Sequence, residues 1–570
     1  MRMKLIYNEK YAGLLVFFIL LFINWISNYS GMFHFGLYED DYWYAAIPMN
    51  STTGQLFSFL GNNITDFTYG QGRFIGMSLP LVLIHFIYGI AGFKAVYIVG
   101  MLLVTLNAYL IFALLRKNYH ILIGLLAAIL FLLFPADTTR PFLCHIYLLH
   151  LSMLFVLVAF LFYAKKLYVV SYLFALFSLL SYESTFLPFI FAPFLVFPAW
   201  NREVKRLGLK HMVVCAVLIL GIFVMRKIGG EERVASLSMI DFAKKTLASS
   251  LIGPVTVMFA MIKSSVESLY YFLVNGLTII IGTIGLFLTL LYFYPNVASS
   301  EKTAFFNINL KYFKAEIVIN EVLQSFLRLF IVSTLMLLTA YLFSYTHYPP
   351  TVLKGRMTSV HYAASIGAAI FIANILYFII LTMKKRKMLV LAVIAVFLGL
   401  LMGYGNIIQK DYAKAWQSQK SLWKDVSVLA SDVEDNTLVF IAKKDLDSTS
   451  YIISHSWAMP AVFNLLYQFP TDWKHPPKVK KLNSWNDLQY NATLNSFFFV
   501  AEYPFLFEQR DTIYLEDKNV IFLEKVNNGL VRKNDSLRIN DHTLHLKPRG
   551  ENILGSSKLT ATGQLMLEDQ

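Results

Sequence analysis

Long apolar runs recur over residues 1–405 of this chain, and many reach the roughly 20 residues that a helix needs to cross a bilayer. Hydrophobic residues make up 57% of the chain and charged residues 15%, whereas a soluble domain carries about 25% charged residues. The pattern therefore predicts an all-α polytopic membrane bundle.

The first apolar run, residues 11–26, follows three basic residues as a signal peptide would. No small-residue cleavage site follows it, and polar Asn24, Ser27 and Asn28 come instead. We interpret it as a retained first span with a cytoplasmic N-terminus.

Segment 74–93 decides the topology. It is long enough to cross, but Pro80, His85, Gly89 and Gly92 interrupt it. If it crossed, the later basic clusters would face outward; if it lies on the outer surface as an interfacial helix, they become cytoplasmic, as the positive-inside rule requires. The predicted spans are then residues 11–28, 95–115, 120–136, 143–163, 167–183, 184–200, 211–225, 271–294, 326–346, 361–383 and 388–404.

These eleven spans place the C-terminus outside, and the expected location is the cytoplasmic (inner) membrane of a bacterium. Segment 226–269 is expected to lie outside as one or two amphipathic helices, and 295–324 to form a cytoplasmic loop. The net charge of +14 agrees with basic cytoplasmic loops and anionic membrane lipids, so no nucleic-acid partner is expected.

The composition becomes that of a soluble domain near residue 406. We expect a transmembrane domain over 1–405, with a first outer loop over 30–94, and a small extracytoplasmic α/β or mostly β domain over 406–570 that ends in a flexible polar tail. A helix is expected over 412–423. Strands are expected over 437–442, 496–501, 512–515, 520–523 and 543–546.

Three consecutive acids, Glu39, Asp40 and Asp41, follow the first span by about ten residues. Adjacent carboxylates repel one another, so other groups must compensate them. The alternatives are a solvated loop with interfacial aromatic residues, or a carboxylate site in a membrane enzyme. We favour the second, because ionisable residues close to spans tend to be functional.

Other charged or polar residues fall at predicted outer span ends and form the candidate substrate-binding set. They are Arg73, Asp137, Arg140, His145, Glu183, Lys354, Arg356 and His361. Each has a structural alternative: Asp137 and Arg140 pair with each other, His145 makes a span-end hydrogen bond, or Lys354 reaches headgroups.

This set suits a donor sugar attached to a lipid phosphate. A carboxylate can take a proton from the acceptor or bind a divalent cation such as Mg²⁺ or Mn²⁺; whether a metal takes part stays open. Arginine and lysine can hold phosphate oxygens. The two cysteines, Cys144 and Cys215, both lie in apolar segments, and we expect neither a disulfide framework nor a thiolate metal site.

The pattern resembles the integral-membrane type C (GT-C) glycosyltransferases. The resemblance rests on Asp40-Asp41 after the first span, Arg73, Leu79-Pro80, the Tyr182-Glu183 turn and the Lys354-Gly355-Arg356 loop. The helix with Trp416, Gln417, Gln419 and Trp423 looks like that of uncharacterised bacterial members. The His-Pro-Pro-Leu signature of some members and the Trp-Trp-Asp signature of oligosaccharyltransferases are absent.

The resemblance implies that Asp40 or Asp41 is the catalytic base or a metal-associated carboxylate, with Glu39 beside it. It implies that Arg73, Arg140, Lys354 and Arg356 hold the lipid phosphate.

The expected activity is transfer of a monosaccharide from a polyprenyl-phosphate donor to a cell-envelope glycan, lipid or protein acceptor on the outer face. The alternatives are a transporter or flippase of lipid-linked saccharide and a surface-polysaccharide polymerase. A transporter should show repeated halves and ionisable residues at the midplane, and neither is evident.

Overall fold

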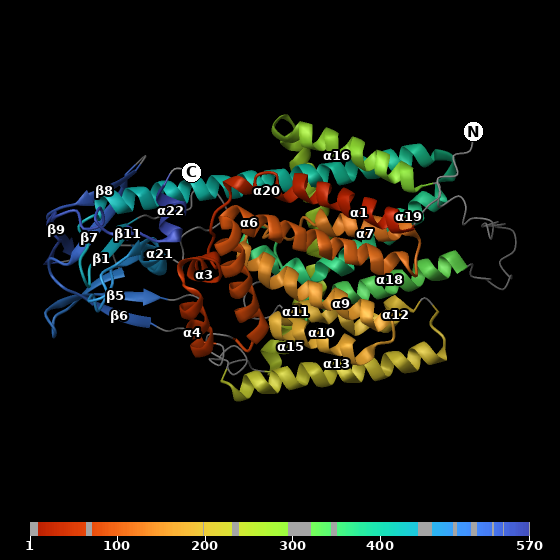
Figure 1. Ribbon diagram of the computed structural model, residues 1–570, viewed down its shortest axis with the longest axis horizontal. Coiled ribbons are helices and arrows are strands. Elements are labelled where there is room, and N and C mark those ends of the chain that lie inside the picture. Colours follow the sequence, from red (N-terminus) through yellow and green to blue (C-terminus); the bar gives the residue numbers. More distant parts are fainter. Residues whose placement is uncertain are drawn as a thin grey trace.

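The computed structural model describes residues 9–63, 71–197, 199–230, 239–294, 321–343, 350–442, 459–482, 487–502, 510–526, 529–539 and 541–568. Helices form an elongated bundle, and a smaller strand region extends from one end of it (Figure 1). Most of the predicted loop 295–324 lies outside the described residues, because the description resumes only at residue 321.

The helices of the bundle range from single turns to 43 residues. Its helices are α1 (Glu9–Asn24), η1 (Trp25–Tyr29), η2 (Met32–His34), α2 (Asp41–Tyr44), α3 (Ala46–Asn50), α4 (Thr53–Asn63), α6 (Phe74–Arg116), α7 (Ile121–Leu132), α8 (Leu143–His145), η3 (Ile146–His150), α9 (Leu151–Ala164), α10 (Tyr168–Ser181), α11 (Glu183–Phe186), η4 (Leu187–Phe191), α12 (Ala192–Val196), α13 (Arg202–Ile228), α15 (Met239–Tyr270), α16 (Phe272–Phe293), α18 (Glu321–Thr339), η6 (Arg356–Ala364), α19 (Ser365–Thr382), η7 (Lys384–Arg386) and α20 (Lys387–Leu429).

Within the described residues, eight helical segments are long and apolar enough to cross a membrane, and four further apolar helices are shorter. Length and composition thus indicate an integral membrane protein, while the predicted count of eleven spans is not confirmed. The burial of side chains also differs between helices, as expected for a bundle surrounded by lipid. Every residue of α7 from Leu122 to Leu132 is buried, whereas α13 and α16 expose large apolar side chains such as Val217 and Leu273. Apolar outer faces of this kind suit contact with lipid tails.

Helix α6 has a kink at Gly92, where φ is 76° and ψ is −176°. A residue with a Cβ adopts this conformation only with strain, so glycine permits the change of direction here. The part before the kink contacts the first loop: the His85 ring nitrogens lie 2.9 Å from the Pro48 carbonyl oxygen and 3.0 Å from the Thr53 hydroxyl. The segment expected as a surface helix is thus a separately oriented helical piece, joined directly to the next span.

The two ends of the bundle carry different elements. We call one the basic end, because α6 ends there at Arg116, α13 begins there at Arg202, and η7 (Lys384–Arg386) leads there into α20 (Figure 1). The strand region extends from the other end, where α3 lies (Figure 1); we call it the acidic end after Glu39, Asp40 and Asp41, which shortly precede α3 in the chain.

Helix α15 lies across the acidic end. Near its start the Thr246 hydroxyl donates to the Leu342 carbonyl, and near its end Glu267 pairs with Lys354 at 2.7 Å. Between these contacts the Lys263 ammonium donates to the Val352 carbonyl at 3.1 Å. All three partners lie in the segment between α18 and α19. A helix is therefore present where one or two were expected within 226–269, but α15 is also long and apolar enough to cross a membrane, so its predicted amphipathic position on the outer surface is not confirmed.

The strand region combines parallel and antiparallel pairing. Its main sheet has the order β3-β1-β7-β8, with β1 parallel to β3 and β7, and β8 antiparallel to β7. The elements are β1 (Leu438–Ala442), α21 (Met459–Leu466), β2 (Tyr467–Gln468), β3 (Lys478–Leu482), β4 (Leu488–Asn491), β5 (Ser496–Glu502), β6 (Arg510–Leu515), β7 (Val520–Val526), β8 (Gly529–Lys533), β9 (Ser536–Ile539), β10 (His542–His545), β11 (Lys558–Leu559) and α22 (Ala561–Leu567). Each of the five expected strand segments coincides with one of these strands.

The strand region is joined to the bundle by α20, which continues through residue 406 without a break. Just beyond α20, Asp432 forms a buried ion pair with Arg532 of β8. The expectation of a flexible polar tail is wrong for residues 561–567, which form helix α22. Thr560 caps this helix, Met566 is buried, and the Thr562 hydroxyl bonds to Asn50 of the first loop. Apolar Leu565 and Met566 give the tail a face to bury.

Candidate functional site

The three consecutive acids occupy a tight turn that leads into α2. Glu39 has a φ of 39°, in the left-handed region that residues other than glycine rarely adopt. Such a backbone persists where surrounding contacts impose it, often at functional sites. The turn directs the three carboxylates into different surroundings, so adjacent acids are compensated by different partners.

The carboxylate of Asp41 is fully buried and bonded to the main chain. Its Oδ1 accepts a hydrogen bond from the Cys144 amide at 2.7 Å, and its Oδ2 accepts one from the Tyr38 amide at 3.1 Å. Burial raises the pKa of Asp41 to about 7, although these amide donors oppose the rise. Both oxygens are used internally, so Asp41 fixes the first loop onto α8.

Asp40 and Glu39 share one arginine. Arg356 Nη2 lies 3.1 Å from Asp40 Oδ2, and Arg356 Nη1 lies 3.3 Å from Glu39 Oε2. The Asp40 side chain is 19% exposed and that of Glu39 4% exposed. Burial raises the pKa of both carboxyls, that of Glu39 to about 8, while Arg356 opposes the rise. Asp40 is therefore the most accessible of the three acids.

Arg356 reaches the acids because the preceding loop is anchored. Gly355 has a φ of 88° and donates its amide to the Thr138 hydroxyl at 2.8 Å. The Thr138 amide in turn donates to the Thr358 hydroxyl at 3.0 Å. A glycine is required at this backbone conformation. The Lys354-Gly355-Arg356 segment is thereby held beside the segment that contains Asp137 and Arg140.

Arg73 and Glu183, both in the predicted set, form a two-point ion pair. Arg73 Nε and Nη2 lie 3.0 and 2.8 Å from the Glu183 oxygens, and the guanidinium stacks on the Tyr182 ring. Arg226 adds a second cation to Glu183 at 3.1 Å. The charge of Arg73 also acts on Asp40, where it opposes the burial that raises the Asp40 pKa. Arg73 therefore belongs to the electrostatic environment of the acidic loop.

Lys354 and His361 have internal partners. Lys354 Nζ lies 2.7 Å from Glu267 and 2.9 Å from Asp411, so it joins α15 to α20. His361 has no exposed surface, and its ring bonds to the Tyr341 hydroxyl and the Thr351 carbonyl, both at 2.7 Å. These contacts give both residues a structural role at the acidic end.

Asp137 and Arg140 line a pocket with Asn28, Tyr404 and Gln409. Asp137 Oδ1 accepts from the Thr139 amide and hydroxyl, at 3.0 and 2.7 Å, while Arg140 donates to the Phe131 carbonyl. Their mutual ion pair, one alternative from the sequence, does not form within the described residues. Burial raises the pKa of Asp137 and lowers that of Arg140.

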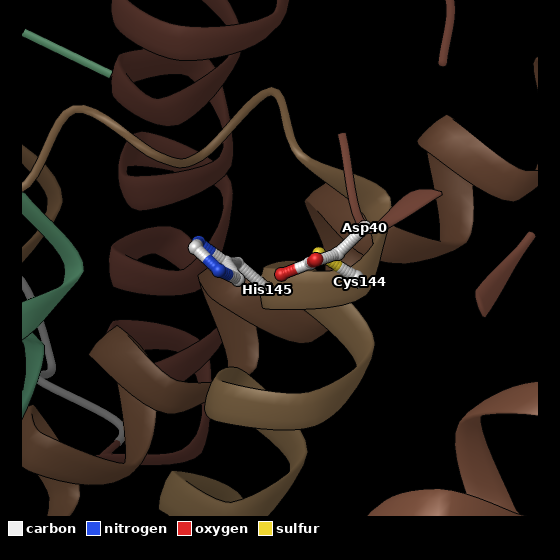
Figure 2. A group of neighbouring side chains, drawn as sticks. All are labelled: Asp40, Cys144 and His145. Atoms are coloured by element: carbon white, nitrogen blue, oxygen red, sulfur yellow. The ribbon is translucent and has the colours of Figure 1, made fainter. Parts of the chain in front are cut away.

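Cys144 is a neighbour that the sequence argument missed. Asp40, Cys144 and His145 each offer one potential ligand atom, and these atoms lie within 4.8 Å of one another (Figure 2). With two cysteines in the chain, a metal site built from three or four thiolates is excluded. A site that combines one thiolate with a carboxylate and an imidazole is not. The available signal was that Asp40 and Cys144-His145 occupy predicted outer span ends. Arg226, Glu267 and Asp411 were also missed, because their partners are distant in the chain.

No protein-family model, curated protein or solved structure matches the chain significantly. The geometry of the acidic end is therefore the basis for assigning a function.

Proposed function

We propose that this protein is a membrane glycosyltransferase that takes a monosaccharide from a polyprenyl-phosphate donor. The observation that carries the proposal is the partly exposed Asp40 carboxylate, held 3.1 Å from Arg356 and within the field of Arg73. Such a transfer needs two functions side by side: a carboxylate that accepts a proton from the acceptor, and cations that hold the phosphate of the donor.

In the proposed reaction, the acceptor hydroxyl loses its proton to Asp40 and its oxygen bonds to the anomeric carbon. The bond between that carbon and the phosphate oxygen breaks, and the polyprenyl phosphate leaves with the negative charge. Arg356 stabilises this charge. Since Arg356 pairs with Glu39 and Asp40 in the structure, a bound phosphate would draw the guanidinium away and make Asp40 a stronger base.

The proposal includes a topology of eleven crossings. Of the eight long apolar helices, α15 lies across the acidic end, and the remaining seven together with the four shorter apolar helices make eleven. The positive-inside rule then places the basic end in the cytoplasm and the acidic end outside. The apolar outer faces, such as that of α16, would contact lipid tails, including the polyprenyl chain of the donor.

The decisive experiment uses the purified full chain in detergent, with polyprenyl-phosphate-linked monosaccharides and candidate acceptors. A transferase forms product in the absence of any membrane barrier, whereas a flippase has no task there. The proposal fails if no lipid-phosphate sugar yields product while the reconstituted protein moves lipid-linked saccharide across vesicles.

A further inference from the structure

We propose that Asp40, Cys144 and His145 form a binding site for a divalent cation of the zinc type. A carboxylate oxygen, a thiol sulfur and an imidazole nitrogen, carried by the first loop and α8, lie within 4.8 Å of one another. Figure 2 shows the three side chains as neighbours. The site shares Asp40 with the Arg356 ion pair at 3.1 Å, so a bound cation would replace that contact. It does not depend on the proposed transferase activity.

The spacing is close to that of a metal site. Ligand atoms 2.0–2.3 Å from one tetrahedral ion lie about 3–4 Å from each other. The three donor atoms already lie within 4.8 Å of one another, so side-chain adjustments of roughly 1 Å would bring them to an ion. Such adjustments are within the rotamer freedom of Asp40, whose side chain is partly exposed.

His145 supplies an independent observation. The residue is 9% exposed, and its Nδ1 is buried with no hydrogen-bond partner within the described residues. A buried polar nitrogen without a partner is costly, and metal coordination is one way to satisfy a histidine ring. The unpartnered nitrogen, whose burial costs free energy unless a ligand binds it, thus belongs to one of the three residues of the cluster.

A main-chain hydrogen bond next to the cluster also fixes its position. Asp41 Oδ1 accepts the Cys144 amide at 2.7 Å, so the residue after Asp40 binds the main chain of the proposed thiolate ligand. This hydrogen bond fixes the two segments that carry the ligands relative to each other. We assign Asp41 the role of a positioning residue for this site.

The donor set selects the cation. Thiolate and imidazole ligands favour Zn²⁺ over Mg²⁺ and Mn²⁺, which prefer oxygen ligands. In the sequence, carboxylates alone suggested Mg²⁺ or Mn²⁺; the thiol and the imidazole change the preferred cation to Zn²⁺. Three protein ligands leave a fourth position for water or an oxygen of a bound molecule, as in catalytic zinc sites.

The test uses Co²⁺ as a spectroscopic substitute for Zn²⁺ in the purified full chain, stripped of metal by a chelator. We expect one equivalent of Co²⁺ to bind with an absorption band from sulfur-to-cobalt charge transfer. Zn²⁺ should displace it, and excess Mg²⁺ should not. Cys144→Ser should abolish the band. His145→Ala should weaken Co²⁺ binding by about tenfold or more, with folding of each variant checked by size-exclusion chromatography.

Cys215→Ser is the matched control, because Cys215 is the other cysteine of the chain and lies beside His211 at 3.4 Å. The His211 ring is already bonded to the Tyr172 hydroxyl and the Phe189 carbonyl, so this variant should keep the band. Absence of the band in the native chain, or a band that survives Cys144→Ser and disappears in Cys215→Ser, would overturn the proposal. Because these readouts are spectroscopic, they stand even if the protein transfers no sugar.

Discussion

Asp40 and Asp41 are adjacent in the chain, yet their carboxylates have opposite surroundings. Asp40 is 19% exposed and faces Arg356, whereas Asp41 is fully buried and accepts amide hydrogen bonds from Cys144 and Tyr38. The geometry therefore separates a group that can meet a substrate from a group that holds the loop.

Asparagine substitutions should expose this difference. Asp40→Asn should lower transfer by about a hundredfold, the scale of a lost general base, with little change in thermal stability. In Asp41→Asn one amide donor would face the side-chain NH₂ group, and the loss should be about 1–3 kcal/mol of stability. Transfer assays and thermal unfolding in detergent, with Glu39→Gln as a comparison, measure both effects. Near-normal transfer by Asp40→Asn would remove the catalytic assignment.

Arg356 should affect use of the lipid-phosphate donor. Arg356→Lys keeps the charge but loses the planar two-point fork, so kcat/KM for the donor should fall. Arg356→Ala should lower it further, by roughly 1.5–3 kcal/mol, or about ten- to hundredfold. Arg386→Ala at the basic end is the matched control and should leave kcat/KM unchanged. Equal losses in both alanine variants would contradict a role at the site.

The topology can be tested by cysteine labelling. Single cysteines at Thr53 and Ser556 should react with an impermeant reagent added to intact cells, because both positions belong to the acidic end or the strand region. A cysteine at exposed Lys385 should react only after permeabilisation. Labelling of position 385 in intact cells would reverse the proposed orientation.

Gly36 should be intolerant of a side chain. A Cβ at this position would overlap the indole of Trp416 in α20, so Gly36→Ala forces one of the two segments to move. We expect a loss of about 1–3 kcal/mol in stability. Gly61→Ala, in α4 where a Cβ would meet nothing within 4 Å, should be neutral or slightly stabilising. Thermal unfolding of the two variants side by side decides the matter.

The Asp432–Arg532 pair should make the strand region sensitive to acid. Burial would raise the pKa of Asp432, but hydrogen bonds from Arg532 and the Gly550 amide hold it below the ordinary value. The stabilisation is therefore present above the unfolded pKa of about 3.9 and is lost as pH falls through the lower folded pKa. Limited proteolysis should detect opening of the strand region at acid pH. Asp432→Asn should open it already at neutral pH; unchanged protection would contradict the prediction.

The sequence predicted the helical character, the glycine-interrupted segment before the second span and the strand positions, because these depend on local periodicity and on breaks such as Gly92. It could not distinguish Asp40 from Asp41, since the distinction arises from a left-handed turn at Glu39. It also could not pair Arg73 with Glu183, 110 positions apart, because only tertiary packing brings them together. For the same reason the burial of α22 against the first loop was not foreseen.

Helix α20 extends for 43 residues from η7 at the basic end to the strand region, without a break. Along its way the Gln419 side chain bonds to the Leu37 carbonyl and the Tyr42 hydroxyl, and the Tyr38 hydroxyl donates to the Tyr412 carbonyl. A continuous helix transmits displacement along its axis more effectively than a flexible linker does. A partner that binds the strand region and displaces it would therefore also displace α20 and, through these hydrogen bonds, change the geometry of the turn that carries Glu39, Asp40 and Asp41.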